Sequence, residues 1–165
     1  MRFSPSIVVV ATMLFVAACS SNPSTDASGS SAATGGSLGS GVSSAPVPGS
    51  QEDLVVQVGD RVFFDTDRSD LRPDQQATVE KLAAWLRRND NVHLVLEGHA
   101  DERGTREYNL ALGERRANSV RASLIAYGIP ASRLSTISYG KERPEVVGST
   151  EYAWAQNRRV VFVVS

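Results

Sequence analysis

The chain has 165 residues, and its 17 basic and 18 acidic side chains leave a formal net charge of −1 at pH 7. This balance excludes a bulk electrostatic attraction to nucleic acid. The length suits one compact domain with a tail. Of the basic residues only Lys81 and Lys141 are lysines. The arginine excess fits a carboxylate ligand, although a genome rich in G and C would give the same bias without any function.

The N-terminus has the organisation of an export signal. Arg2 precedes an almost unbroken apolar run from Ile7 to Ala18, and small residues lead into Cys19. We interpret residues 1–18 as a signal peptide, because the run is shorter than the roughly 20 apolar residues that span a bilayer. Cys19 is the only cysteine, and the small-small-Cys ending resembles the lipobox of bacterial lipoproteins.

The resemblance to a lipobox implies that a lipid is attached to Cys19, which would be the only non-protein group of the molecule. Ser20 follows the cysteine, where an aspartate would indicate retention in the inner membrane in many bacteria. We therefore expect an anchor in the outer membrane, with the domain facing the periplasm. The alternative is a secreted protein with one unpaired thiol.

Residues 19–52 are expected to form a flexible tether after the lipidated cysteine. From residue 20 to residue 50 the chain is rich in Ser, Gly, Ala, Pro and Thr, and Asp26 is its only charged residue. Such a segment cannot bury enough apolar surface to offset the entropy lost on ordering. The folded domain is therefore predicted to comprise residues 53–165.

Within that domain the apolar pattern changes repeatedly between the periods of strands and helices. Strands are expected at Arg61–Asp65, Val92–Glu97, Leu134–Tyr139 and Val160–Val164. Pro73 opens a helix that ends before Asn89, a second long helix runs from Thr105 to Tyr127, and Glu151–Gln156 forms a short helical turn. The order β-α-β-α-β-(short α)-β predicts an α/β (α+β) two-layer sandwich, with two main helices on one face of a mixed sheet.

The densest polar constellation lies where the second strand meets the second long helix. Asn109, Leu112 and Arg116 share one face of that helix because they are spaced by three and seven residues. The loop that carries Asp101 directly precedes the same helix. An acid and an arginine can therefore face one cleft at this corner, and loops on a rigid sheet often carry binding groups.

The sequence around this corner resembles the OmpA-like peptidoglycan-binding domain family. The resemblance covers about residues 60–164 and is carried by several motifs in register. These motifs are Glu97–Thr105, Tyr108–Asn109, Leu112–Ala117, Ser138–Pro144 and Asn157–Val160.

The resemblance implies that the domain binds the meso-diaminopimelate side chain of the peptidoglycan stem peptide. Asp101 would receive the ammonium group of the ligand, and Arg116 would bind its carboxylate. Asn109 would brace the loop or the ligand by hydrogen bonds, and Asp67 is a further candidate for the rim. Taken alone, Asp101 is better explained as a turn or helix-start carboxylate and Arg116 as a surface or core-edge salt-bridge partner; the surrounding motif reverses this and favours the binding role.

The resemblance also implies a protein partner, TolB, with other Tol proteins as further candidates. Glu102, Arg103, Lys141 and Glu142 are the expected contacts. If these residues surround the same cleft, TolB and peptidoglycan would compete for one face. A docking protein with no wall ligand of its own is the alternative.

The remaining alternative is an enzyme that acts on peptidoglycan. A zinc hydrolase would have to draw its ligands from His93, Glu97, His99 and Asp101. The two histidines are six residues apart, on a strand and in a loop, which is not a recognised zinc spacing. We therefore expect a binding protein that is not an enzyme and has no metal site and no cofactor.

Overall fold

The computed structural model describes residues 45–165. The predicted signal peptide, Cys19 and most of the predicted tether lie outside these residues. Within residues 45–165, no helix combines the length and the hydrophobicity needed to cross a bilayer.

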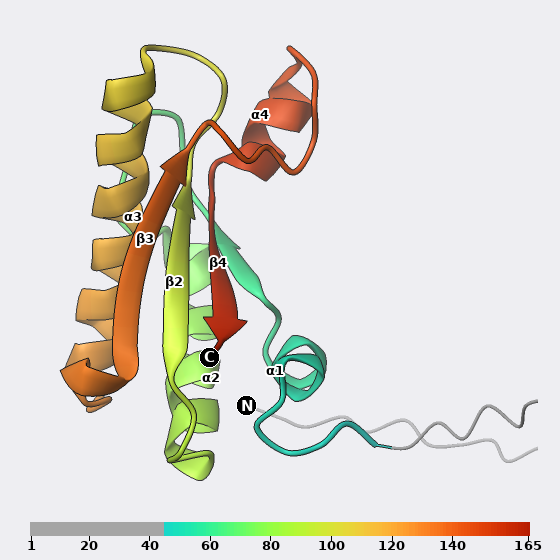
Figure 1. The fold of residues 1–165 in the computed structure, drawn as a ribbon, viewed down its shortest axis with the longest axis vertical. Coiled ribbons are helices and arrows are strands. Elements are labelled where there is room, and N and C mark those ends of the chain that lie inside the picture. The colour runs from blue at the N-terminus through green and yellow to red at the C-terminus, as the bar shows by residue number, and fades with distance from the viewer. Residues whose placement is uncertain (1–44) are drawn as a thin grey trace, which may run out of the picture. The chain divides into compact units, whose positions relative to one another are not determined.

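A four-stranded sheet forms the centre of the domain, in the order β1-β4-β2-β3 (Figure 1). The strands are β1 (Arg61–Phe63), β2 (Leu94–His99), β3 (Leu134–Gly140) and β4 (Arg159–Val164). β2 and β3 are parallel, and β4 runs antiparallel to both β1 and β2. The predicted mixed sheet is therefore confirmed.

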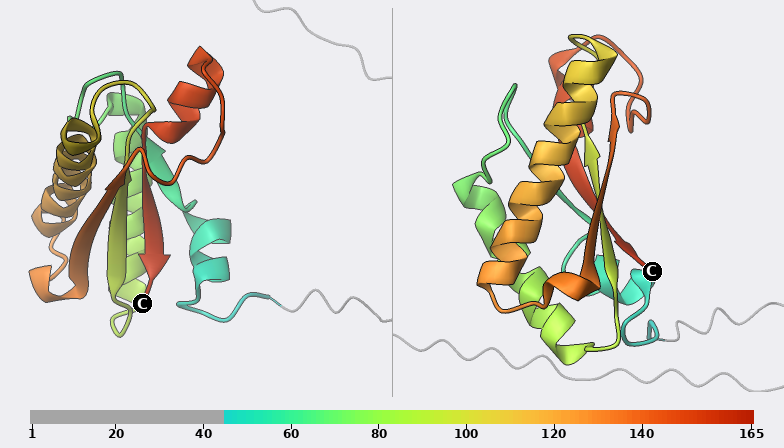
Figure 2. Two further views of the ribbon diagram at one scale, coloured as in Figure 1. Left: turned by 45° about the horizontal axis from the view of Figure 1, so that its top comes forward. Right: turned by 60° about the vertical axis from the view of Figure 1, so that its left-hand side comes forward.

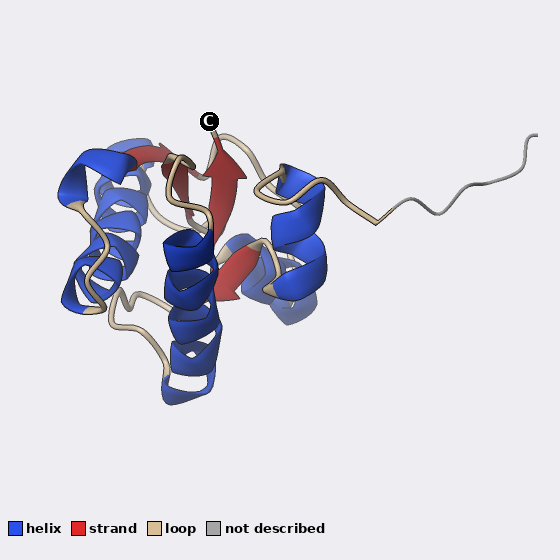
Figure 3. Ribbon diagram, turned by 90° about the horizontal axis from the view of Figure 1, so that it is seen from below, coloured by secondary structure: helices blue, strands red, loops and turns tan. Residues whose placement is uncertain are grey.

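The two long helices, α2 (Pro73–Arg88) and α3 (Arg106–Ala126), cover one face of this sheet (Figures 2 and 3). The apolar stripe of α2 is fully buried. Its members are Val79, Leu82, Ala83 and Leu86. They pack with alternate residues of β2 and β4, among them Leu96 and Phe162, in one continuous core. The predicted two-layer arrangement is confirmed.

The long helices begin and end within one residue of their predicted bounds, whereas β1 and β2 differ from theirs. Thr105 caps α3 by accepting a hydrogen bond from the Tyr108 N–H. β2 lies two residues further along the chain than predicted, because Gly98 still pairs with β3 and β4. β1 is shorter than predicted, since Phe64 leaves the ladder and donates its N–H to the carbonyl of Arg158. The short helix is α4 (Glu151–Asn157), as expected.

The sequence did not indicate two short helices, α1 (Gln51–Gln57) and the 3₁₀ helix η1 (Ala131–Arg133). α1 crosses the predicted boundary between residues 52 and 53, and Ser50 caps it. The Gln51 side chain accepts a hydrogen bond from the Val164 N–H and donates one to the carbonyl of Phe162. These bonds fix α1 against the last residues of β4.

The tether end and the predicted binding loop lie at opposite ends of β2 (Figure 1). Leu94, the first residue of β2, pairs with Val164, where α1 is attached. Asp101 follows His99, the last residue of β2. Six residues of strand separate the two ends, which corresponds to about 17 Å.

The N-terminal half of α3 approaches β2 unusually closely, and two glycines permit this. A Cβ atom on Gly98 would lie 1.9 Å from the carbonyl oxygen of Gly113, and a Cβ on Gly113 would lie 2.4 Å from the Ser138 hydroxyl. The strands β2 and β3 also change register between Gly98 and His99. Such irregularities redirect a strand next to a functional loop. The glycine contact therefore sets where the start of α3 meets the loop of Asp101.

Gly98→Ala is expected to destabilise the fold, because the new methyl group would collide with backbone rather than with a flexible side chain. The expected loss in the free energy of unfolding is about 3 kcal/mol or more. Gly128→Ala is the control, since its added Cβ has no neighbour within 4 Å and only its positive φ costs about 1 kcal/mol. Urea unfolding compares the two; equal losses would contradict the packing argument.

Candidate functional site

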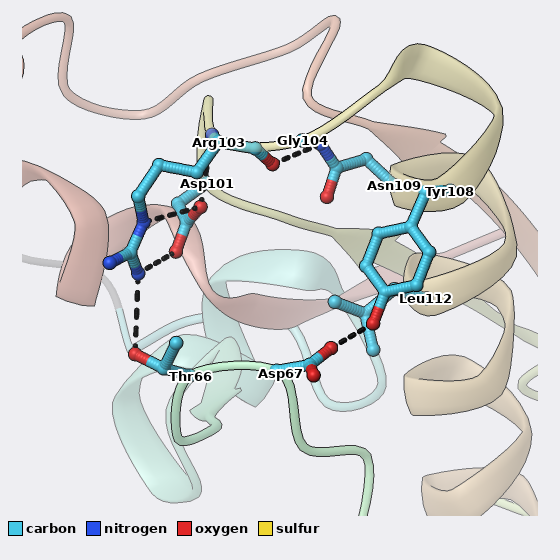
Figure 4. A pocket seen from close by; sticks show the side chains of 8 residues that line it. All are labelled: Thr66, Asp67, Asp101, Arg103, Gly104, Tyr108, Asn109 and Leu112. Carbon is cyan, nitrogen blue, oxygen red and sulfur yellow. Dashed lines mark hydrogen bonds and ion pairs between the residues drawn. The ribbon is translucent and has the colours of Figure 1, made fainter.

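A pocket of about 330 Å³ opens between the C-terminal end of β2 and the start of α3 (Figure 4). Its walls come from the loop after β1, the loop after β2 and the first two turns of α3. The lining residues are Thr66, Asp67, Asp101, Arg103, Gly104, Tyr108, Asn109 and Leu112. The structure thus brings together three of the four predicted ligand residues, Asp101, Asn109 and Asp67, and leaves Arg116 outside the lining.

Asp101 is a nearly buried carboxylate in the pocket wall, with 7% of its surface exposed. Its Oδ2 accepts hydrogen bonds from Arg103 Nη2 at 2.6 Å and from Arg158 Nη1 at 3.4 Å. Its Oδ1 accepts the backbone N–H and the Nε–H of Arg103. Burial would raise the pKa of Asp101, but the hydrogen bonds from Arg103 and then Arg158 outweigh it and lower the pKa. The side chain is therefore an anion at neutral pH.

Asn109 holds the loop that follows β2. It is 2% exposed, and its Nδ2 donates to the carbonyl oxygen of Arg103 at 2.7 Å. Gly104, which follows Arg103 in the chain, has φ +87°, a conformation that glycine adopts without penalty. Of the two roles expected for Asn109, bracing the loop is the one that the geometry shows.

Asp67 lies on the opposite wall in a strained backbone conformation. Its φ of 56° is the only positive value of a non-glycine residue in the described part of the chain, and Asp tolerates it better than most residues. Its carboxylate accepts a hydrogen bond from the Tyr108 hydroxyl, which raises the pKa of Tyr108. Thr66 beside it accepts a hydrogen bond from Arg103. The two walls are therefore joined across the pocket.

Arg116 lies behind the walls and is fully buried. Its Nε donates to the carbonyl of Arg68 at 2.8 Å, its Nη1 to that of His99 at 2.8 Å and its Nη2 to that of Asp65 at 3.0 Å. The expectation that Arg116 presents its fork to a ligand is not what this geometry shows. The guanidinium instead ties the loop after β1 to the end of β2, and direct contact with a ligand stays a prediction.

The charge of Arg116 is only partly compensated. Among residues 45–165, no carboxylate lies within salt-bridge distance of it. Burial lowers the pKa of Arg116 to about 10, and Asp101 and Asp67 act in the opposite direction. A buried cation without a direct counterion is costly. The positive charge behind the pocket therefore favours an anionic group close by.

Of the four residues expected to contact a protein partner, only Arg103 lines this pocket, whereas Glu102 and Lys141 line a second, smaller pocket. Lys141 Nζ donates to the carbonyls of Glu102 and Gly104. Glu142 forms an ion pair with Arg106 at 3.4 Å, and Arg103 is itself a lining residue.

The structure does not assemble the zinc ligands that a hydrolase would need. Within residues 45–165, no three side chains of His, Cys, Asp or Glu are grouped so that they could hold a metal ion. His99 is 2% exposed, and burial lowers its pKa to about 4. Its nearest acid is Glu97, at 4.0 Å from Nε2. This neutral histidine packs against Tyr139.

Four lining residues were not predicted as site residues, namely Thr66, Gly104, Tyr108 and Leu112. Tyr108 belongs to the family motif, and its spacing places it next to Asn109 at the start of α3. Thr66 carried no such signal, because its position depends on the turn around Asp67 and on contacts with a loop 37 residues away.

Comparison with known proteins agrees with this architecture. The family model described as OmpA family matches residues 63–158, which include every lining residue of the pocket. The chain belongs to the OmpA family.

Within that family, the relatives that match nearly the whole chain are named peptidoglycan-associated lipoproteins. The protein of Agrobacterium fabrum is 47% identical, with 98% of this chain and 88% of the relative covered. That of Pseudomonas aeruginosa is 42% identical, with 97% and 96% covered. These matches extend through most of the N-terminal segment that the structure does not describe.

Solved structures show the same fold. The peptidoglycan-associated lipoprotein of Burkholderia pseudomallei is 40% identical, covers 64% of this chain and 90% of its own, and has a TM-score of 0.63. The C-terminal domain of MotB from Helicobacter pylori is 25% identical, covers 64% and 84%, and has a TM-score of 0.60.

Arg116→Lys is expected to weaken the domain even without any ligand. Lysine keeps the charge but cannot serve three carbonyls in a plane, so buried acceptors would lose their donors. The expected loss is at least about 2 kcal/mol in the free energy of unfolding. Arg115→Lys, at an exposed neighbouring position, is the matched control. If urea unfolds both variants at the same concentration as the unchanged protein, Arg116 does not hold the walls.

Proposed function

We propose that the protein is a lipid-anchored, non-enzymatic protein that binds peptidoglycan without a covalent bond. Its ligand would be the end of the meso-diaminopimelate side chain, which carries one ammonium and one carboxylate group. The pocket at the start of α3 would bind this end, and the lipid on Cys19 would hold the chain to the outer membrane. The domain would then connect membrane and wall from the periplasm.

The observation that carries this proposal is the charge arrangement of the pocket. Two carboxylates, Asp101 and Asp67, line it, and the buried cation Arg116 lies behind it without a direct counterion. A zwitterion offers an ammonium to the acids and a carboxylate to the positive field. Sheltered charge-assisted hydrogen bonds of this kind contribute roughly 1.5–3 kcal/mol each.

The relatives support the rest of the proposal, since their names describe lipoproteins associated with peptidoglycan. A modest affinity is sufficient for a tethered domain, because tethering raises the effective ligand concentration to about the millimolar range. The lipid supplies the tight attachment, at about 0.8 kcal/mol for each buried CH₂, and stable anchoring needs two or more chains.

The sharpest test replaces Asp101, because Arg116 variants would disturb the walls whether or not the residue meets the ligand. Asp101→Asn keeps the shape and removes the charge. Full-length protein in detergent should bind purified sacculi about 10–150-fold more weakly after this change. Asp90→Asn, at an exposed acid beyond the other end of β2, should bind normally. Equal retention of both folded variants would refute the assignment of the site.

We propose TolB, which the family resemblance implies, as the protein partner, within the Tol–Pal system that serves envelope integrity and cell division. Arg103 belongs to both the predicted partner contacts and the pocket lining, and Lys141 binds the loop between Asp101 and α3. One face would therefore serve both ligands.

Competition is the expected consequence of a shared face. Titration of a labelled diaminopimelate peptide should show a weaker apparent affinity as TolB is added, and saturating TolB should prevent binding. Simultaneous binding of both at unchanged strength would exclude the shared face while leaving each interaction intact.

A further inference from the structure

Trp154 of α4 is outside the pocket lining but is in contact with Arg103, a charged residue of that lining. The Arg103 guanidinium lies over the Trp154 ring, 4.2 Å from its centroid. The indole Nε1 donates to Glu102 Oε1 at 3.0 Å. The ring is therefore held in place by the residue that precedes Arg103 in the chain, and it supports one face of the guanidinium.

In the free protein Arg103 occupies the position that the ammonium of a ligand would need. It gives Asp101 three hydrogen bonds, from its backbone N–H, its Nε and its Nη2. A carboxylate has about four acceptor positions, and Arg158 takes another. A ligand ammonium can bind Asp101 only by displacing one of the two arginines.

Arg103 is the arginine that can move. Its side chain is 39% exposed, whereas that of Arg158 is 8% exposed. Arg158 is also held by Glu151 at 2.7 Å and by the carbonyl of Phe64. Apart from Asp101, the side chain of Arg103 contacts only the Thr66 hydroxyl at 3.3 Å and the face of Trp154 among the polar and aromatic partners within residues 45–165.

We propose that Trp154 is a positioning residue that retains Arg103 at the rim when the ligand takes Asp101, so that the freed guanidinium meets the carboxylate of the same ligand. This inference rests on the proposed function. The stacking leaves the edge of the guanidinium free, and that edge carries the donors. Arg103 thus blocks the empty site and becomes part of the occupied one.

The Trp154 ring is suited to this role because its helix, α4, is firmly attached to the rest of the domain. Asn157, at the end of α4, accepts hydrogen bonds from the N–H groups of Glu145 and Val146 and donates one to the Val146 carbonyl. Arg158, the next residue, binds both Glu151 and Asp101. Trp154 can therefore stay in place while Arg103 changes partner.

The exchange predicts a preference among ligands. A ligand with both an ammonium and a free carboxylate breaks the ion pair between Arg103 and Asp101 and forms two new ones, its ammonium with Asp101 and its carboxylate with Arg103. A ligand whose carboxylate is amidated breaks the same pair and gives Arg103 no anion in return. The contribution of Trp154 should therefore appear with the free acid and be absent with the amide.

The experiment measures binding of two muropeptides to full-length protein in detergent, one with free and one with amidated diaminopimelate. Trp154→Ala should weaken binding of the free acid about twofold to fivefold and leave binding of the amide unchanged. Trp154→Phe keeps an aromatic face and loses only the bond to Glu102, so it should bind both as the unchanged protein does.

Fluorescence supplies a second measurement that does not depend on the folding of the alanine variant. The chain has two tryptophans, and Trp85 is fully buried and bonded to Asp53. The free acid should change the emission of the unchanged protein and not that of Trp154→Phe.

Two results would overturn the positioning role while the proposed function stands. One is that Trp154→Ala loses affinity equally for both muropeptides; the other is that the free acid still changes the emission of Trp154→Phe. Failure of the unchanged protein to bind either muropeptide would overturn the proposed function, and the positioning role with it.

Discussion

The pocket depends on one buried guanidinium. Arg116 donates to three carbonyls, two in the loop after β1 and one at His99, the last residue of β2, so a single side chain ties together the two segments that carry the pocket walls. A lysine or a neutral side chain could not replace this planar set of donors. The cation that fixes the walls also supplies positive potential behind them. Under the proposed function, structure and binding chemistry would share one residue, which makes the usual loss-of-binding experiment ambiguous at this position.

Local signals predicted the long elements well. The apolar spacing of both helices and the proline start of α2 are signals that act within a few residues, and the structure has α2 and α3 as predicted. Local signals also predicted β3 to within one residue of its end. β2 was misplaced by two residues, because Gly98 was interpreted as a loop residue. In the structure, Gly98 belongs to the strand, and its lack of a side chain allows the close approach of Gly113.

The pocket itself could be predicted only in part. Asp101 and Asn109 lie on one strand–helix corner, so their proximity follows from the element order. The wall formed by Thr66 and Asp67 depends on a left-handed residue and on bonds to Arg103 and Tyr108 that are about 40 residues away in sequence. No local pattern encodes such contacts. The family resemblance supplied Asp67 and the importance of Arg116, and geometry was needed to show what Arg116 contacts.

The placement of α1 and the pocket at opposite ends of β2 has a mechanical consequence. In the proposed role, a pull between an anchored N-terminus and a bound wall peptide would act along the strand direction. β2 is hydrogen-bonded on both sides, to β3 and to β4. Such a pull would have to slide strands past one another and break many hydrogen bonds at once, whereas a pull across the sheet would open them one after another. The topology therefore lets a small domain resist tension while its individual contacts remain weak.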